Sequence, residues 1–179
     1  MQITTQRLVI RPWQTQDLPA FGELNADPEV RRYYHPALLS RAESDATVEQ
    51  CTEHLSTHGF AFLAIERQED GALLGGAGLS WTDIVPGGPA VEIGWILARP
   101  FWRQGYAREA SHAWLAHGWS IGLRQIIGYT SAINHPSRHL MEALGMARNP
   151  GDDFPDPTVP EDSPLSPHVL YRIHNPHLR

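Results

Sequence analysis

Alternating and periodic apolar positions along the chain predict interleaved strands and helices. Apolar residues alternate with other residues from Leu8 to Pro12, which predicts a first strand. Similar segments predict strands at 60–66, 73–81, 91–97, 124–130 and 168–173. Helical spacing predicts helices at 17–24, 40–58, 106–121 and 134–144, with a further helical turn after Asp27-Pro28. The predicted order is β-α-α-β-β-β-α-β-α-β, an α/β (α+β) pattern.

Short local signals set the ends of these elements. Ser40 followed by Glu43 is a capping box, and Gly59 is a stop signal at the other end of the same helix. Asn134 is typical of a residue that caps a helix.

Residues 149–167 form a Pro-rich loop too long for a simple connection, and such loops are often functional. We expect this loop to border a substrate cleft and to favour positively charged substrates through its five carboxylates, which are Asp152, Asp153, Asp156, Glu161 and Asp162. The alternative is a solvated surface loop.

Composition limits the class of protein. With 179 residues, 41% hydrophobic and 19% charged, residues 1–179 fit one soluble globular domain. The first residues lack a signal-peptide pattern, and no apolar run approaches the roughly 20 residues of a membrane helix. Cys51 is the single cysteine, so no internal disulfide is possible. We therefore expect a cytoplasmic protein without a membrane partner, present as a monomer or homodimer.

The charge balance argues against a nucleic-acid partner. The net charge is −6, which disfavours binding dominated by phosphate contacts. All 14 cationic side chains are arginine, which we attribute to coding bias. The chain therefore offers no lysine side chain to an acylating agent.

A turn near the middle of the chain carries the clearest chemical signal. The predicted strand 91–97 leads through Arg103 to Gly105, and a helix begins directly afterwards. Glycine permits close approach of the backbone, and the unpaired amides of a first helical turn attract anions. Arg103 and Arg108 add positive charge. The turn therefore predicts an anion site suited to a pyrophosphate.

A hydroxyl lies at the start of a later helix. Ser137, Leu140, Met141 and Leu144 share one helical face by their spacing. Ser137 thus stands at the N-terminal end of an otherwise apolar stripe. The alternative is that Ser137 is only a capping residue.

The turn at Gly105, followed along the chain by the helix that carries Ser137, resembles the GCN5-related N-acetyltransferases (GNATs). The resemblance rests on Gly105-Tyr106-Ala107, Asn134-x-x-Ser137 and Leu144-Gly145-Met146. The opening segment 5–12 and the strand Glu92-Ile93-Gly94-Trp95 resemble the branch of ribosomal-protein N-terminal acetyltransferases. The resemblance implies one domain with a mixed, mostly antiparallel sheet of about six to seven strands flanked by helices. Trp102 departs from the family pattern, which usually has Gln or Arg at that place.

The resemblance implies an acetyl-CoA-dependent N-acetyltransferase that acts on a primary amine, either a protein N-terminal α-amine or a small amine. Ser137 would protonate the leaving thiolate. The Leu97 amide would face the thioester oxygen, and Asn134 would bond the pantetheine arm. The residues implied to contact acetyl-CoA are Ile96, Leu97, Arg103, Gln104, Gly105, Tyr106, Ala107, Arg108, Asn134 and Ser137. The alternative from another class is a non-catalytic acyl-CoA-binding or sensing module on the same fold.

Glu92 is the candidate base. Strand alternation places Glu92, Gly94 and Ile96 on one sheet face. A carboxylate among apolar neighbours in mid-strand is costly unless it has a function. We expect Glu92 to deprotonate the amine through water, and the alternative is an ion-paired or solvated glutamate.

Several other patterns are expected to have ordinary structural roles. The His54/His58 and His135/His139 pairs have no evident third ligand, so no metal site is predicted, and His54/His58 is expected on a solvated helix face. Cys51 is expected in the core with Val48 and Leu55. The segment Gly75-Gly76-Ala77-Gly78 is expected to serve close backbone approach. The acceptor cleft is expected near Trp13, Tyr33, Tyr34, Trp81 and the loop 149–167, and the alternative for these aromatic residues is an ordinary place in the core.

Overall fold

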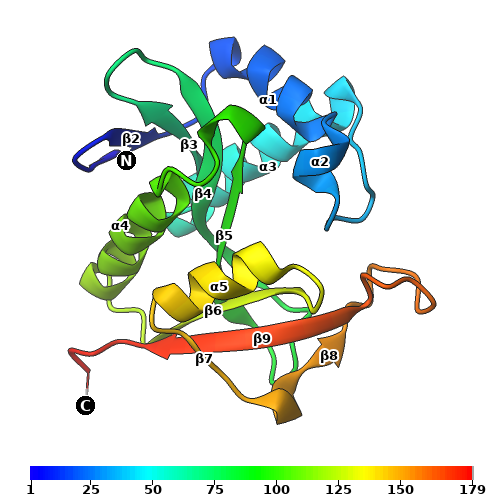
Figure 1. Ribbon diagram of the computed structural model, residues 1–179. Helices are drawn as coiled ribbons and strands as arrows, with labels where there is room; N and C mark the ends of the chain where they lie inside the picture. The colour runs from blue at the N-terminus through cyan, green and yellow to red at the C-terminus, as the bar shows by residue number, and fades with distance from the viewer. Residues whose placement is uncertain (179) are drawn as a thin grey trace.

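The computed structural model describes residues 1–178 and shows an open sheet with helices on both faces (Figure 1). Nine strands lie in the order β1-β2-β3-β4-β5-β6-β9-β7 within these residues, and β8 also pairs with β9. The strands are β1 (Ile3–Thr4), β2 (Leu8–Arg11), β3 (Phe62–Arg67), β4 (Leu73–Thr82), β5 (Ala90–Leu97), β6 (Gln125–Ser131), β7 (Ala147–Arg148), β8 (Phe154–Pro155) and β9 (Pro167–His174). The helices are α1 (Leu18–Asn25), α2 (Pro28–Arg31), α3 (Arg41–His58), α4 (Tyr106–Ser120) and α5 (His135–Ala143), with 3₁₀ turns at Thr15–Asp17, Arg99–Phe101 and Pro150–Asp152.

The predicted order of elements is confirmed, and the ends of the major helices and strands differ from prediction by at most two residues. The sheet is mostly antiparallel, as the resemblance implied, and β5 with β6 is its parallel pair in the described residues. Six of the nine strands are longer than two residues; β1, β7 and β8 are two-residue additions that periodicity could not detect. None of the helices described in residues 1–178 is long and apolar enough to cross a membrane.

The longest helix, α3, begins and ends at the residues that its sequence signals predict. The Ser40 side chain accepts from the Glu43 amide, while the Ser40 amide donates to Glu43 Oε2 at 2.7 Å. Gly59 then adopts φ +79°, the left-handed conformation that glycine takes without a steric penalty. The capping box and the glycine stop are confirmed.

The two faces of β5 contact different layers of helices. Ile93 and Leu97 belong to the larger core, where they meet Ala110 and Trp114 of α4. Ile96 points to the other face and packs with Phe21 of α1 in a smaller cluster. The predicted alternation along this strand is therefore confirmed for the apolar residues.

The glycines of β4 are required for close approach, as predicted. A Cβ on Gly78 would lie 2.1 Å from the Ala61 carbonyl oxygen, and a Cβ on Gly75 would lie 2.2 Å from the Ile96 carbonyl oxygen. Both distances are far below van der Waals contact, so the neighbouring backbones approach only because these side chains are absent.

The central feature for function is where β5 and β6 separate. Their parallel register is set at Glu92 and Ile127. β5 continues to Leu97 and β6 to Ser131. Two cavities, described below, are lined by Trp95 and Ile96 in the C-terminal half of β5. Figure 1 shows α5 lying across the front of this region, next to β6.

Candidate active site

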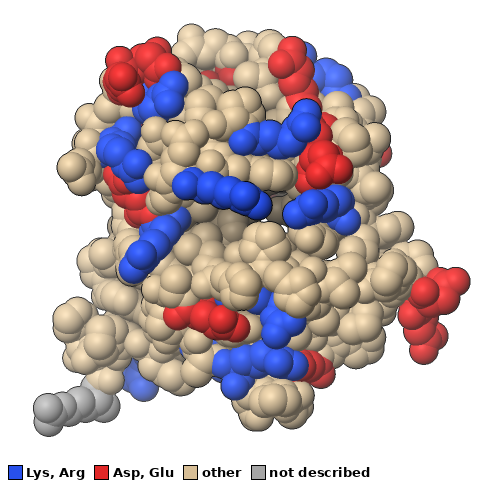
Figure 2. All heavy atoms as spheres, viewed as in Figure 1, with Lys and Arg blue, Asp and Glu red and all other residues tan. Residues whose placement is uncertain are grey.

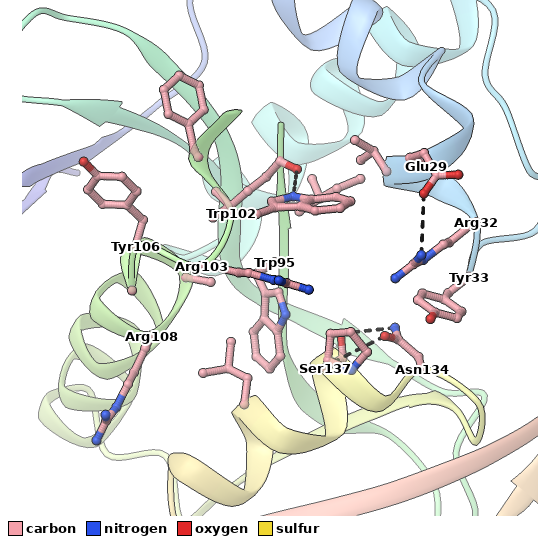
Figure 3. A pocket seen from close by; sticks show the side chains of 18 of the residues that line it. Glu29, Arg32, Tyr33, Trp95, Trp102, Arg103, Tyr106, Arg108, Asn134 and Ser137 are labelled. Carbon is pink, nitrogen blue, oxygen red and sulfur yellow. Dashed lines mark hydrogen bonds and ion pairs between the residues drawn. The ribbon is translucent and has the colours of Figure 1, made fainter. Parts of the chain in front are cut away.

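Two adjoining cavities open where β5 and β6 diverge. The smaller has a volume of about 370 Å³ and is bounded by the beginning of α4 (Figure 3). The larger, of about 630 Å³, extends between the sheet and the α1–α3 layer. Both are lined by the same six residues, Tyr33, Tyr34, Trp95, Ile96, Asn134 and Ser137. The two cavities therefore meet at a shared wall.

The smaller cavity contains an anion cradle. Arg103 and Gly105 adopt φ +59° and +82°, two left-handed residues that turn the chain into α4. The first four amides of an α-helix lack intrahelical acceptors, and here they belong to residues 105–108. Arg32, Arg103 and Arg108 also line this cavity, and Figure 2 shows basic side chains gathered around the hollow on this face. Helix amides, helix dipole and guanidinium groups therefore act together on an anion.

The N-terminal segment of the chain holds the start of α4 in place. Glu109 accepts hydrogen bonds from the Thr5 hydroxyl at 2.6 Å, the Arg7 amide at 2.9 Å and Arg7 Nε at 2.7 Å. The Arg7 guanidinium also stacks over the Tyr106 ring at 4.4 Å. Thr5 and Arg7, which marked the resemblance to one branch of the family, thus support the cradle from behind.

The edge of β5 presents backbone groups to the opening. The Ala98 amide donates to the Leu74 carbonyl at 2.9 Å, so the alternation of an antiparallel pair turns the peptide groups of Trp95 and Leu97 away from β4, toward the divergent β6. Trp102 Nε1 donates to the Leu97 carbonyl at 2.7 Å. The unusual Trp102 therefore braces the strand, while the Leu97 amide faces the gap.

Asn134 and Ser137 form a hydrogen-bonded pair at the start of α5. Asn134 Nδ2 donates to Ser137 Oγ at 3.1 Å and to Thr130 Oγ1 at 2.9 Å, which uses both of its hydrogens. Asn134 Oδ1 accepts from the Ser137 amide at 3.3 Å and keeps one lone pair for a ligand. Because Ser137 Oγ is the acceptor in this pair, its own proton is free to point into the cavities that Ser137 lines.

Glu92 lines the larger cavity, on the same wall as Ile96. Ser80 Oγ donates to Glu92 Oε1 at 3.0 Å. Burial raises the pKa of Glu92 above its usual value, and hydrogen bonds from Ser80 and Tyr129 oppose that rise. A carboxylate with a raised pKa is a better proton acceptor near neutral pH than an ordinary glutamate.

The structure brings most of the predicted residues together. Gln104 lies outside the lining: its side chain donates to the Pro100 carbonyl at 2.7 Å, and its carbonyl accepts from Arg7. Tyr106 lines the cavity, although Figure 3 shows its ring directed away from the centre. The predicted residues that line the smaller cavity are Ile96, Leu97, Arg103, Gly105, Tyr106, Ala107, Arg108, Asn134 and Ser137.

The aromatic residues expected around the acceptor cleft divide into two groups. Tyr33 and Tyr34 line the larger cavity. Trp13 instead stacks on Phe21 at 4.4 Å and donates to the Phe62 carbonyl, as a packing residue. Trp81 is 47% exposed and lies outside both linings. The expectation for Trp13 and Trp81 was wrong because sequence alone does not show which face of the fold a tryptophan reaches.

The loop 149–167 borders the larger cavity through Asp156, Thr158 and Val159. The carboxylates of Asp152 and Asp153 do not take part. They form ion pairs with Arg172 and Arg148, so their charges are neutralised on the β7–β9 side of the sheet.

Two α3 side chains differ from expectation. Cys51 is a half-buried wall of the larger cavity rather than a core residue, and burial raises the pKa of its thiol to about 11. The thiol is therefore protonated at neutral pH and a poor nucleophile. His54 also lines this cavity, so the expected solvated face applies to His58 alone. Within residues 1–178, no three His, Cys, Asp or Glu side chains are placed to hold a metal ion.

The polar residues of the larger cavity that the sequence did not point to include Arg31 and His168. Arg31 reaches it from α2, and Asp156 lies beside His168, with Oδ2 and Nε2 3.4 Å apart. His168 Nδ1 is 3.1 Å from the Ser166 carbonyl oxygen. Arg31 follows an apolar residue in an ordinary helical turn, so no local pattern distinguishes it; Asp156 was seen only as part of an acidic loop.

The anion cradle at the start of α4 is formed by the turn on which the resemblance to the GNATs rests. Residues 7–147 match the acetyltransferase (GNAT) domain family, and the chain belongs to that family. It is 31% identical, over 153 residues, to the uncharacterised N-acetyltransferase YnaD of Bacillus subtilis (strain 168), covering 83% of this chain and 84% of that protein. The chain is accordingly an acetyltransferase-family enzyme.

Solved structures share the fold. A GNAT-family acetyltransferase from Bacillus anthracis superposes with a TM-score of 0.80 at 24% identity, covering 98% of this chain and 99% of that one. RimL, a ribosomal L7/L12 α-N-protein acetyltransferase solved with coenzyme A, superposes with a TM-score of 0.78 at 15% identity, covering 97% and 98%. At these identities the structural likeness concerns the fold.

Proposed function

We propose that this protein transfers an acetyl group from acetyl-CoA directly to a primary amine. One observation carries the proposal: the anion cradle and the cavity that holds Glu92 meet at a shared wall that includes Ser137. A donor bound by its phosphates and an acceptor beside Glu92 would thus come together at that wall. The coenzyme A bound to RimL, which shares this fold, supports the choice of donor.

The smaller cavity has the features that a coenzyme requires. Amides of residues 105–108 hold the pyrophosphate, with Arg103 and Arg108 at the rim. The β5 edge offers the Leu97 amide, whereas the Ile96 backbone groups face β4 and Ile96 lines the cavity with its side chain. The remaining lone pair of Asn134 Oδ1 accepts from a pantetheine amide. Gln104 contributes through its backbone amide only, because its side chain is bonded to Pro100. The single cysteine and this donor both favour a cytoplasmic protein.

The acetyl thioester supplies an activated acyl group, and the protein supplies proton transfers and orientation. Glu92 accepts a proton from the amine, through water, as nitrogen bonds to the acetyl carbon. The Leu97 amide donates to the acyl oxygen as negative charge builds there. Ser137 Oγ gives its proton to sulfur as the carbon–sulfur bond breaks. A proton from solvent then restores the hydroxyl, and Glu92 releases its proton to solvent. The overall change is amine plus acetyl thioester to acetamide plus thiol.

The test is thiol release from acetyl-CoA in the presence of a panel of primary amines that spans peptides, amino acids and polyamines. We expect amine-dependent release for at least one class, with the N-acetyl product found by mass spectrometry. Glu92→Gln should reduce this rate, whereas Glu49→Gln, at an exposed position on α3, should not. Tight acetyl-CoA binding without release for any amine would contradict the proposal and favour a binding or sensing module.

A further inference from the structure

A buried arginine without an acidic partner lies at the wall of the larger cavity. Arg31 is only 7% exposed. Within residues 1–178 it forms no ion pair, and its three side-chain hydrogen bonds go to neutral oxygens: the Ala37 carbonyl at 3.1 Å, Asn25 Oδ1 at 3.1 Å and the Pro36 carbonyl at 2.9 Å. Buried cations in proteins are normally paired with an anion. This one is not.

The guanidinium retains capacity for a ligand. A guanidinium has five N–H donors, and Nε, Nη1 and Nη2 each use one here. One N–H therefore remains on each terminal nitrogen, so the guanidinium can still donate to an anion such as a carboxylate. Burial lowers the pKa of Arg31, and Tyr34 and Glu43 only partly oppose that effect. The remaining electrostatic need is for a negative charge.

Acidic side chains occupy another part of the same cavity. Tyr34 lies between the two regions: the Arg31 guanidinium stacks over its ring at 4.8 Å, and its hydroxyl donates to the Trp95 carbonyl at 3.3 Å. Glu92 and Asp156 act on each other across the cavity, since Asp156 contributes to the raised pKa of Glu92. The cavity thus carries positive charge at Arg31 and acidic groups near the catalytic wall.

The remaining walls accept an apolar group. Phe21 of α1 and Phe62 of β3 line the cavity. Leu39 and Val159 line it from the loops. A cavity of about 630 Å³ has the size of a small-molecule site. Positive charge, acidic groups and apolar walls together match a molecule with an anion, an amine and an apolar side chain.

We propose that the acceptor is a free amino acid whose carboxylate binds Arg31 and whose α-amine faces Glu92, with an apolar side chain between the aromatic walls. This inference rests on the proposed function and narrows its acceptor. The chemistry is that given above: the amine nitrogen bonds to the acetyl carbon, the thioester carbon–sulfur bond breaks, and the products are an N-acetyl amino acid and free coenzyme A. An α-amine loses its proton more easily than a lysine side chain.

The test compares acceptors with and without the carboxylate. Because amidation also lowers the pKa of the amine, rates are compared at a pH above both amine pKa values. Thiol release is measured with L-phenylalanine, L-leucine and L-methionine and with the amide of each, for wild type, Arg31→Gln and Arg31→Lys. We expect wild type to prefer the acid over its amide by about 10- to 100-fold in kcat/KM, the range of a charged hydrogen-bonded pair. Arg31→Gln should remove that preference while changing the rate with the amide less than about 3-fold, and Arg31→Lys should restore part of it.

Controls separate binding from structural roles. Arg124→Gln removes the same charge at an exposed position outside both linings, and it should retain the preference. If Arg31 variants fail to fold, the N-acetyl amino acids should raise the melting temperature of the wild-type protein more than the N-acetyl amino amides do.

Three results would overturn the inference: equal use of acid and amide by wild type, equal loss on both in Arg31→Gln, or acetylation of peptides or polyamines but of no amino acid. Each of these leaves acetyl transfer itself standing. Absence of transfer to every amine would instead overturn the proposed function.

Discussion

Replacement of Ala107 by glutamate tests the anion cradle most directly. Ala107 is the second residue of α4 and lines the smaller cavity, so Ala107→Glu puts a carboxylate beside the amides proposed to hold the pyrophosphate. Gly105 is a less suitable position because a Cβ there would point to Arg7 Nη2, 3.4 Å away, and would force a side chain onto φ +82°. Glutamate is a good helix former and is favoured in a first turn, so the free energy of unfolding should change by no more than about 1 kcal/mol.

The expected loss of affinity is large. Two like charges about 4 Å apart repel by roughly 4 kcal/mol at an effective dielectric constant near 20. That energy corresponds to about a 10³-fold rise in Kd for coenzyme A. At a coenzyme concentration of about 100 times Kd, wild type gains about 2.7 kcal/mol. For a chain of this length the gain is a Tm rise of about 5–10 °C, which Ala107→Glu should lose completely.

The assay pairs thermal melting with calorimetric titration of coenzyme A. Ala116→Glu is the matched control, since it makes the same residue and charge change at an exposed position of the same helix. It should keep the full Tm rise. Coenzyme affinity within about 3-fold of wild type in Ala107→Glu would refute the cradle. An equal loss in Ala116→Glu would show that net charge, and not the site, governs binding.

Three further predictions follow from single contacts. Glu92→Gln should lower kcat/KM by about 10²-fold at neutral pH, with a smaller loss above the amine's pKa. Burial raises the pKa of Glu92, so the ionised carboxylate destabilises the folded protein at neutral pH. The Tm of the variant should therefore be higher than that of wild type at pH 7 and equal to it at about pH 3. A Tm at pH 7 equal to that of wild type would contradict the argument. The double variant Asp152→Asn with Asp153→Asn should leave the KM for the acceptor unchanged, because both carboxylates are paired with arginines near the surface. For the same reason the free energy of unfolding, measured in urea, should fall by about 1 kcal/mol or less. A raised KM would show that these carboxylates act on the acceptor. Gly78→Ala should lower the free energy of unfolding by about 3 kcal/mol or more, because its Cβ would lie 2.1 Å from a backbone oxygen. Gly94 pairs with Gly78, and a Cβ there would lie 3.8 Å from its nearest neighbour, so Gly94→Ala should be tolerated in the same urea assay. Similar losses of stability in both variants would show that the clash is relieved.

Local signals in the sequence were sufficient for the elements and for the donor site. Helix α3 begins after Ser40 and ends before Gly59 because a capping box and a left-handed glycine act within one turn of the chain. Gly105 marks the start of α4, so the cradle amides, with Arg103 and Arg108, were predictable from one contiguous segment, whereas Arg32 was not. Glu92 was found because strand alternation assigns each residue to a face, and it does line a cavity.

The larger cavity, where we propose that the acceptor binds, could be found only in the tertiary structure. It is built from α2, α3, the sheet and the loop 149–167, segments that approach only when the core packs. Asp152 is neutralised by Arg172, whereas Asp156 of the same loop reaches the cavity. This difference depends on partners that are distant in the sequence. Arg31 became notable only through its burial and the neutral oxygens around it. Caps, turns and periodicity act over a few residues and are written in the sequence, whereas burial and charge pairing depend on how distant segments pack together.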